Sequence, residues 1–177
     1  MKTLTDTYTV SNAGEHGTFF VRTGERYRNT WLQLTVQSTF GTFGYTFGAI
    51  GGTAAAFLSD VSFDYLMGKL MGNDAMVFDA ATTARSVKEL IVRHRRRDDL
   101  SNHEARQLWD ALEEAVDLHH PSEDLFFVAL SEEPLFFDWE VWDIARRVPS
   151  PQAVGFWEKL WPLFLAELQA TGQMVAA

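Results

Sequence analysis

The chain has 177 residues, of which 46% are hydrophobic and 14% aromatic, a composition that suits one compact domain and excludes global disorder. It contains no cysteine, which excludes disulfides, thiol catalysis, iron–sulfur clusters and cysteine-ligated zinc. Its formal net charge is −9, whereas a generic nucleic-acid binder is expected to be basic.

The N-terminal part of the chain predicts a sheet. Polar and apolar residues alternate there in short runs typical of half-buried antiparallel strands. The runs begin near Tyr8, Thr18, Trp31 and Gly41. Gly24 is predicted to mark a turn between the second and third runs. We therefore expect an antiparallel β-meander of three or four strands over residues 1–50.

From Thr53 onward the hydrophobic period becomes helical, and about six α-helices are expected. Ser62, Asp79 and Ser101 are predicted to cap three of them, the last through a capping box with Glu104. The other predicted helices cover residues 54–58, 123–130, 136–145 and 152–170. Pro162 is expected to kink or split the last helix.

A sheet followed by helices is the α+β pattern. We expect a single domain over residues 1–177, with a β-sheet part at 1–50 and a helical part at 53–172 that ends in acidic helices. The N-terminus has no apolar secretory segment, and no stretch has the length of a membrane span. These features predict a cytoplasmic protein that does not engage a membrane.

The negative charge is concentrated towards the C-terminus. Residues 1–78 carry a net charge of −1, residues 79–100 carry +2, and residues 101–177 carry −10. The acidic residues that form the candidate partner-binding surface are Asp110, Glu113, Glu114, Asp117, Glu123, Asp124, Glu132, Glu133, Asp138, Glu140 and Asp143.

The first four of these acids recur at positions i, i+3, i+4 and i+7 of one predicted helix, so they share one face. We expect them to repel one another, with no cation close in the sequence to relieve them. One interpretation is a solvated face that keeps the protein soluble. The other is a surface for a basic partner, on which carboxylates imitate the phosphates of a nucleic-acid duplex.

A basic run, formed by Arg93, Arg95, Arg96 and Arg97, ends the helix that Asp79 starts. It is a secondary candidate patch for binding phosphates. The alternative is structural: cations near a helix C-terminus are favoured by the helix dipole, and they can pair with the acidic helices.

The sequence contains no nucleophile motif, no phosphate-binding loop and no histidine spacing typical of a metal site. We therefore predict no catalytic residue, no metal and no cofactor. A small metal-dependent enzyme acting on nucleic acid or a nucleotide is kept as an alternative.

Several segments spread over most of the chain carry a family signature. They are residues 30–41, 57–58, 63–70, 109–112 and 155–162. These segments resemble a group of small, uncharacterised accessory proteins of tailed phages and prophages. The resemblance implies the context of a mobile genetic element and brings no catalytic constellation with it.

In that context, a small acidic protein without cysteine resembles inhibitors of bacterial defence, including anti-CRISPR proteins. The leading hypothesis is an inhibitor that blocks the DNA-binding surface of a CRISPR-Cas surveillance complex or another nucleic-acid-binding defence protein. It would contact that partner through the acidic helices and is not expected to bind DNA directly. The alternative is direct nucleic-acid binding through the basic run, Arg93–Arg97.

Overall fold

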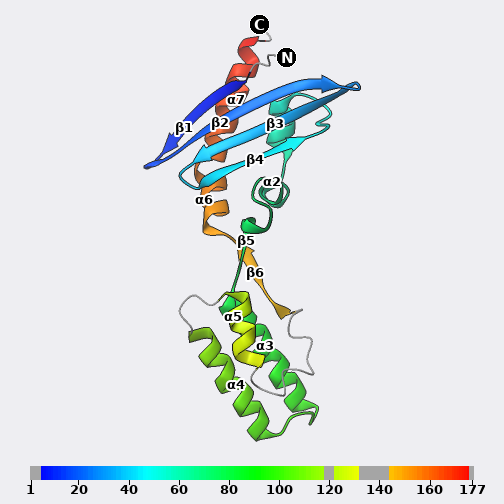
Figure 1. Ribbon diagram of the computed structural model, residues 1–177, viewed down its shortest axis with the longest axis vertical. Coiled ribbons are helices and arrows are strands. Elements are labelled where there is room, and N and C mark those ends of the chain that lie inside the picture. The colour runs from blue at the N-terminus through cyan, green and yellow to red at the C-terminus, as the bar shows by residue number, and fades with distance from the viewer. Residues whose placement is uncertain (1–4, 118–121, 132–143, 176–177) are drawn as a thin grey trace. The chain divides into compact units, whose positions relative to one another are not determined.

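The computed structural model describes residues 5–117, 122–131 and 144–175 (Figure 1). The chain folds into two compact units. The sheet unit comprises Met1–Met76 and Pro149–Ala177, and the helical unit comprises Val77–Val148. The α+β class is confirmed. The expectation of one domain divided near residue 50 did not anticipate this arrangement, in which four α-helices belong with the sheet.

Four antiparallel strands form a meander in the order β1-β2-β3-β4, as predicted. The strands are β1 (Asp6–Asn12), β2 (Glu15–Arg26), β3 (Asn29–Ser38) and β4 (Gly41–Phe47). Along β3 the apolar residues Leu32, Leu34 and Val36 are fully buried, and the residues between them are half-buried. The alternation therefore gives the sheet one apolar face, which the helices of the same unit cover.

Two turns of this meander lie at residues with positive φ. Ala13 and Gly14 join β1 to β2, and Tyr27 and Arg28, with φ of 51° and 66°, join β2 to β3. The predicted turn at Gly24 is wrong, because Gly24 lies inside β2 opposite Trp31. A Cβ at this position would meet the Trp31 indole at 2.6 Å, so the glycine makes room for that ring.

Helices from two separate stretches of the chain complete the sheet unit (Figure 1). They are α1 (Ala54–Asp60), α2 (Phe63–Leu70), the 3-10 helix η1 (Gly72–Ala75), α6 (Pro151–Lys159) and α7 (Trp161–Val175). The predicted effect of Pro162 is confirmed, because the chain forms two helices there and the proline occupies the first turn of α7. Phe156, Leu160 and Phe164 recur every four residues and are fully buried.

The core of the sheet unit is aromatic. The ring of Phe19 on β2 stacks on that of Phe164 on α7, with centroids 4.1 Å apart, and lies 5.8 Å from that of Phe156 on α6. All three side chains are fully buried. This stack therefore ties the sheet to the two helices that return to it from the far end of the chain.

The helical unit has its own apolar core. Its helices are α3 (Ala80–Arg96), α4 (Asn102–Asp117) and α5 (Glu123–Ser131). The core contains Ala84, Val87 and Ile91 of α3, Leu108, Leu112 and Ala115 of α4, and Phe126, Phe127 and Leu130 of α5. The helix predicted over residues 136–145 falls largely outside the described residues.

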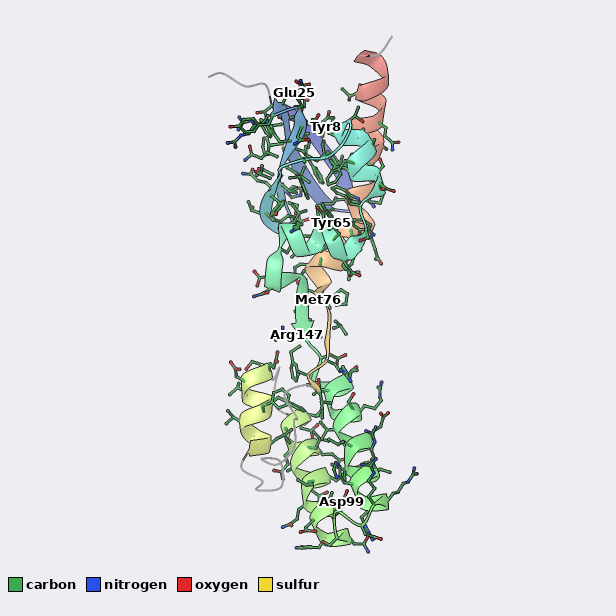
Figure 2. All side chains as sticks on the ribbon, turned by 90° about the vertical axis from the view of Figure 1, so that its right-hand side faces the viewer. Tyr8, Glu25, Tyr65, Met76, Asp99 and Arg147 are labelled. Carbon is green, nitrogen blue, oxygen red and sulfur yellow. The ribbon has the colours of Figure 1, made fainter. Side chains whose placement is uncertain are left out.

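Two short strands carry the chain into and out of the helical unit. They are β5 (Met76–Phe78) and β6 (Arg147–Pro149), and they pair with each other; Met76 and Arg147 are labelled in Figure 2. The amide of Arg146 donates to the hydroxyl of Thr83, a fully buried polar residue, at 2.9 Å. The sequence did not predict this pair, because three-residue strands have no readable period.

The aromatic stack gives a direct test of the sheet unit. Replacing Phe19 with alanine is expected to destabilise that unit by about 3–5 kcal/mol, because the change empties a fully buried site. Denaturant unfolding followed by tryptophan fluorescence measures the loss. Tyr27→Ala is the control: this side chain is 86% exposed, and its removal is expected to change stability by less than about 0.5 kcal/mol. Equal effects of the two changes would contradict the packing described.

The N-cap of α3 predicts a pH dependence. The hydroxyl and then the amide of Thr82 donate to the carboxylate of Asp79, and these bonds hold the pKa of Asp79 below its ordinary value. The carboxylate form is the acceptor, so its stabilisation is complete above the unfolded pKa and is lost as the pH falls through the folded pKa.

Asp79→Ala is therefore expected to cost about 1 kcal/mol near neutral pH. The difference from the parent should narrow as the pH falls below about 4. Urea unfolding followed by far-ultraviolet circular dichroism at several pH values measures it. A difference that does not depend on pH would show that the carboxylate does not cap the helix.

Candidate functional site

The acidic residues predicted on α4 lie at its surface. Glu113, Glu114 and Asp117 are exposed, and the side chain of Asp110 is 49% exposed. The buried positions of the same helix, Leu108, Leu112 and Ala115, fix which side turns away from the core. The helical spacing in the sequence therefore placed these four acids correctly at the surface.

The expectation that no cation close in the sequence relieves the α4 acids is wrong for Asp110, and a cation distant in the sequence pairs with Glu113. Nε of Arg106 lies 3.0 Å from Asp110 one turn along the helix. Nζ of Lys88 on α3 lies 2.9 Å from Oε1 of Glu113, and the indole Nε1 of Trp109 donates to the same oxygen at 2.9 Å. The hydrogen bond from Lys88, followed by that from Trp109, lowers the pKa of Glu113.

The predicted acids at the start of α5 also divide into a paired and an unpaired residue. Nη2 and Nε of Arg147 donate to one oxygen of Glu123, at 2.6 Å and 3.0 Å. Asp124 is exposed and has no ion pair within the described part of the chain. In the same ranges, Glu114 and Asp117 are likewise without an ion pair.

Five further acids of the predicted surface lie outside the described residues: Glu132, Glu133, Asp138, Glu140 and Asp143. Of the six that are described, Asp110, Glu113 and Glu123 are neutralised by a cation. Within the described residues, the acidic candidate surface therefore has three unpaired carboxylates, those of Glu114, Asp117 and Asp124.

The basic run at the end of α3 contains one structural arginine. Nε of Arg95 donates to the side-chain oxygen of Asn102 at 2.7 Å, and its Nη1 donates to the carbonyl of Leu100 at 3.2 Å. Its Nη1 also lies 3.5 Å from Asp98. Arg95 therefore holds the loop between α3 and α4, as the structural interpretation of the run predicts.

The capping box that starts α4 is confirmed beside this loop. The amide of Ser101 donates to Glu104 at 2.7 Å, and the amide of Glu104 donates to the serine hydroxyl at 3.2 Å. The first of these bonds is the main cause of the lowered pKa of Glu104. The loop is therefore tied at both ends, by Arg95 and by the box.

The other three arginines of the run form no ion pair with the described part of the acidic helices. Arg93, Arg96 and Arg97 are exposed, and no acid of the described ranges forms an ion pair with them. They line a hollow of about 670 Å³ on the surface of the helical unit. The other lining residues are Arg85, Lys88, Glu89, Val92 and Trp109. Asp99, labelled in Figure 2, follows the run.

Sequence reasoning missed Arg85, Lys88 and Trp109 as members of this site. A signal was present, because residues 85, 88, 92 and 96 follow one another at helical spacing of three and four. Trp109 comes from α4, so the spacing along α3 does not reveal it. In the structure it is half-buried, and the ammonium of Lys88 lies 4.4 Å from the centroid of its ring.

The described residues contain no group of three histidine, aspartate or glutamate side chains that could hold a metal ion. Nor does any helix in these ranges have the length and apolar character needed to cross a membrane. The site consists of charged and aromatic surface groups, which are suited to binding.

The two roles within the basic run can be separated by matched substitutions. Arg95→Ala is expected to cost about 1 kcal/mol, because it removes hydrogen bonds that hold the α3–α4 loop. Arg96→Ala is expected to change stability by less than about 0.5 kcal/mol, because this exposed side chain has no ion pair in the described residues. Urea unfolding followed by circular dichroism compares the two. A larger cost for Arg96→Ala than for Arg95→Ala would reverse the assignment.

Comparison with known proteins adds the biological context. No curated protein and no solved structure matches this chain. Residues 2–167 match the model of a phage family, Phage_phiTE_072. The match confirms the resemblance to phage proteins and gives no activity. Because it spans most of the 177 residues, the chain belongs to this phage family.

Proposed function

We propose that this phage protein inhibits bacterial defence in the manner of an anti-CRISPR protein. It binds a CRISPR-Cas surveillance complex, or another nucleic-acid-binding defence protein, in the cytoplasm of the host. It acts by occupying the partner's DNA-binding surface and not by catalysis. Membership of a phage family supports the setting, and the charge of the helical unit supports the mode of binding.

The observation that carries the proposal is the set of exposed, unpaired carboxylates on α4 and α5. Glu114 and Asp117 stand one turn apart on a helix whose other side is buried, with Cβ atoms about 5–6 Å from each other. No described cation lies within ion-pair distance of them or of Asp124. A rigid row of such carboxylates can replace DNA phosphates against arginine and lysine side chains of a partner.

The net charge of the helical unit reinforces this argument. Residues 77–148 contain 16 acidic and 9 basic side chains, whereas the rest of the chain contains 8 and 6. A negative unit is steered towards a positively charged DNA channel, which raises the association rate at low salt. The unit that holds the candidate surface therefore also carries most of the excess negative charge.

The test is a plaque assay in host strains that each carry one type of CRISPR-Cas system and express this protein. We expect the protein to restore plating of a targeted phage in at least one strain. The variant E114Q/D117N/D124N is expected to lower that protection roughly tenfold, because it removes charges that steer and hold the partner. Its association with the purified surveillance complex should also become less sensitive to salt.

The matched control is E25Q/D60N/E158Q, which removes the same charge from exposed acids of the sheet unit that have no described ion pair. We expect it to protect as well as the parent. An equal loss of protection in both variants would show that only the overall charge matters, and it would contradict the assigned surface. Absence of protection in every strain would contradict the proposed function.

A further inference from the structure

Within the described residues, the hollow on α3 gathers unpaired charge of the opposite sign to that of the acidic surface. Five of its eight lining residues are basic and one, Glu89, is acidic. Four of the guanidinium groups in it form no ion pair with any described residue: Arg85, Arg93, Arg96 and Arg97. This excess of positive charge lies on a unit that is acidic as a whole, so it is a local feature of one helix.

The like charges of this helix have a cost. Arg93 lies three and four positions from Arg96 and Arg97, which is the spacing at which side chains of a helix meet. Like charges at that spacing destabilise a helix. Glu89, four positions before Arg93, offsets part of this repulsion, but it forms no ion pair with these arginines. Buried Val87 and Ile91 hold α3 in place, so the guanidinium groups cannot separate by moving the helix. An anionic ligand would relieve this repulsion.

The length of the basic row indicates an extended ligand. Arg85 and Arg97 are 12 positions apart, which corresponds to about 18 Å along a helix. A second hollow of about 440 Å³ shares Arg85 and Lys88 and is also lined by Glu113 and Asp117. A third of about 480 Å³ shares Val92, Arg96 and Trp109. A free phosphate or a single nucleotide would occupy only part of this row.

The hollows also contain apolar and aromatic surface beside the cations. Val92 is 39% exposed and lies in two of the three hollows, together with the half-buried Trp109. The indole is fixed by its hydrogen bond to Glu113 and by Lys88 against its ring. Proteins that bind single strands of nucleic acid combine a basic groove with aromatic side chains in this way, because the bases stack while the phosphates meet cations.

We infer that this row of hollows along α3 and α4, the α3 groove, binds a single strand of nucleic acid. The phosphates lie against Arg93, Arg96 and Arg97, and a base lies against Trp109 and Val92. The inference goes beyond the proposed inhibitor, for which no direct DNA binding is expected, and it rests on the arginines and Trp109 rather than on the unpaired carboxylates of α4 and α5. The carboxylates of an acidic polypeptide could pair with the cations, but they would not stack on the aromatic surface.

The test uses the purified full-length protein and a fluorescein-labelled oligonucleotide of twelve deoxythymidines, followed by fluorescence anisotropy at low salt. We expect binding that weakens steeply as salt is added, because phosphate contacts release counterions. R93S/R96S/R97S is expected to weaken binding at least about tenfold, in keeping with the loss of three phosphate contacts. Trp109→Leu is expected to weaken it at least about fivefold, through loss of base stacking.

The matched control is R26S/R28S/K69S, which removes three exposed cations from the sheet unit and so has the same net charge as R93S/R96S/R97S. We expect its affinity for the oligonucleotide to lie within about twofold of that of the parent, because it keeps every residue of the α3 groove. Circular dichroism checks that each variant is folded. If the triple variant is not folded, the single change Arg96→Ser is used in its place. Three results would overturn the inference: no binding at low salt, equal loss in the control, or displacement by poly-glutamate as effective as by unlabelled oligonucleotide.

Two further competitors complete the test. Displacement by ATP at concentrations as low as those of the oligonucleotide would show a nucleotide pocket in place of a strand-binding groove. Equal displacement by duplex DNA would show that no base is stacked and would overturn the role of Trp109. Because no defence complex is present in this assay, its outcome is independent of the inhibitor proposal.

Discussion

The apolar seam between α3 and α4 determines where the charges of the helical unit lie. Val87 and Ile91 on one helix and Leu108 and Leu112 on the other are almost completely buried. Once these positions face inward, the arginines of α3 and the carboxylates of α4 must face outward. Lys88 and Glu113 meet where the two sets adjoin. The seam thus sorts a mixed sequence into a basic groove and an acidic surface on a single small unit.

The local features of the fold could be predicted from the sequence. The alternation of apolar and polar residues predicted β3, because every second side chain of a strand, here Leu32, Leu34 and Val36, points to the same face of the sheet. The first residues of three helices could be predicted because the side-chain oxygens of Ser62, Asp79 and Ser101 accept hydrogen bonds from free backbone amides. Such signals are encoded within four residues, so they do not depend on the rest of the chain.

What the sequence did not show involves residues brought together by folding. Lys88 and Glu113 are 25 positions apart, and Glu123 and Arg147 are 24 apart, so no spacing rule connects them. The contact of Trp109 with Lys88 also joins two helices. By contrast, the pair of Arg106 with Asp110 has helical spacing, so the sequence does contain the signal for it, although the pair was not predicted. The candidate site was therefore predictable as a set of charges, but not as a set of paired and unpaired groups.

Pairing changes the meaning of the net charge of −9. Half of the described acids of the predicted surface are neutralised within the molecule, whereas four arginines of the α3 groove are not. A bare DNA channel would attract the first surface and repel the second. A partner that already holds a nucleic acid strand presents basic protein and anionic backbone side by side. Such a partner is complementary to both surfaces, so the two proposals together favour a complex that carries its own nucleic acid strand beside a free DNA-binding surface.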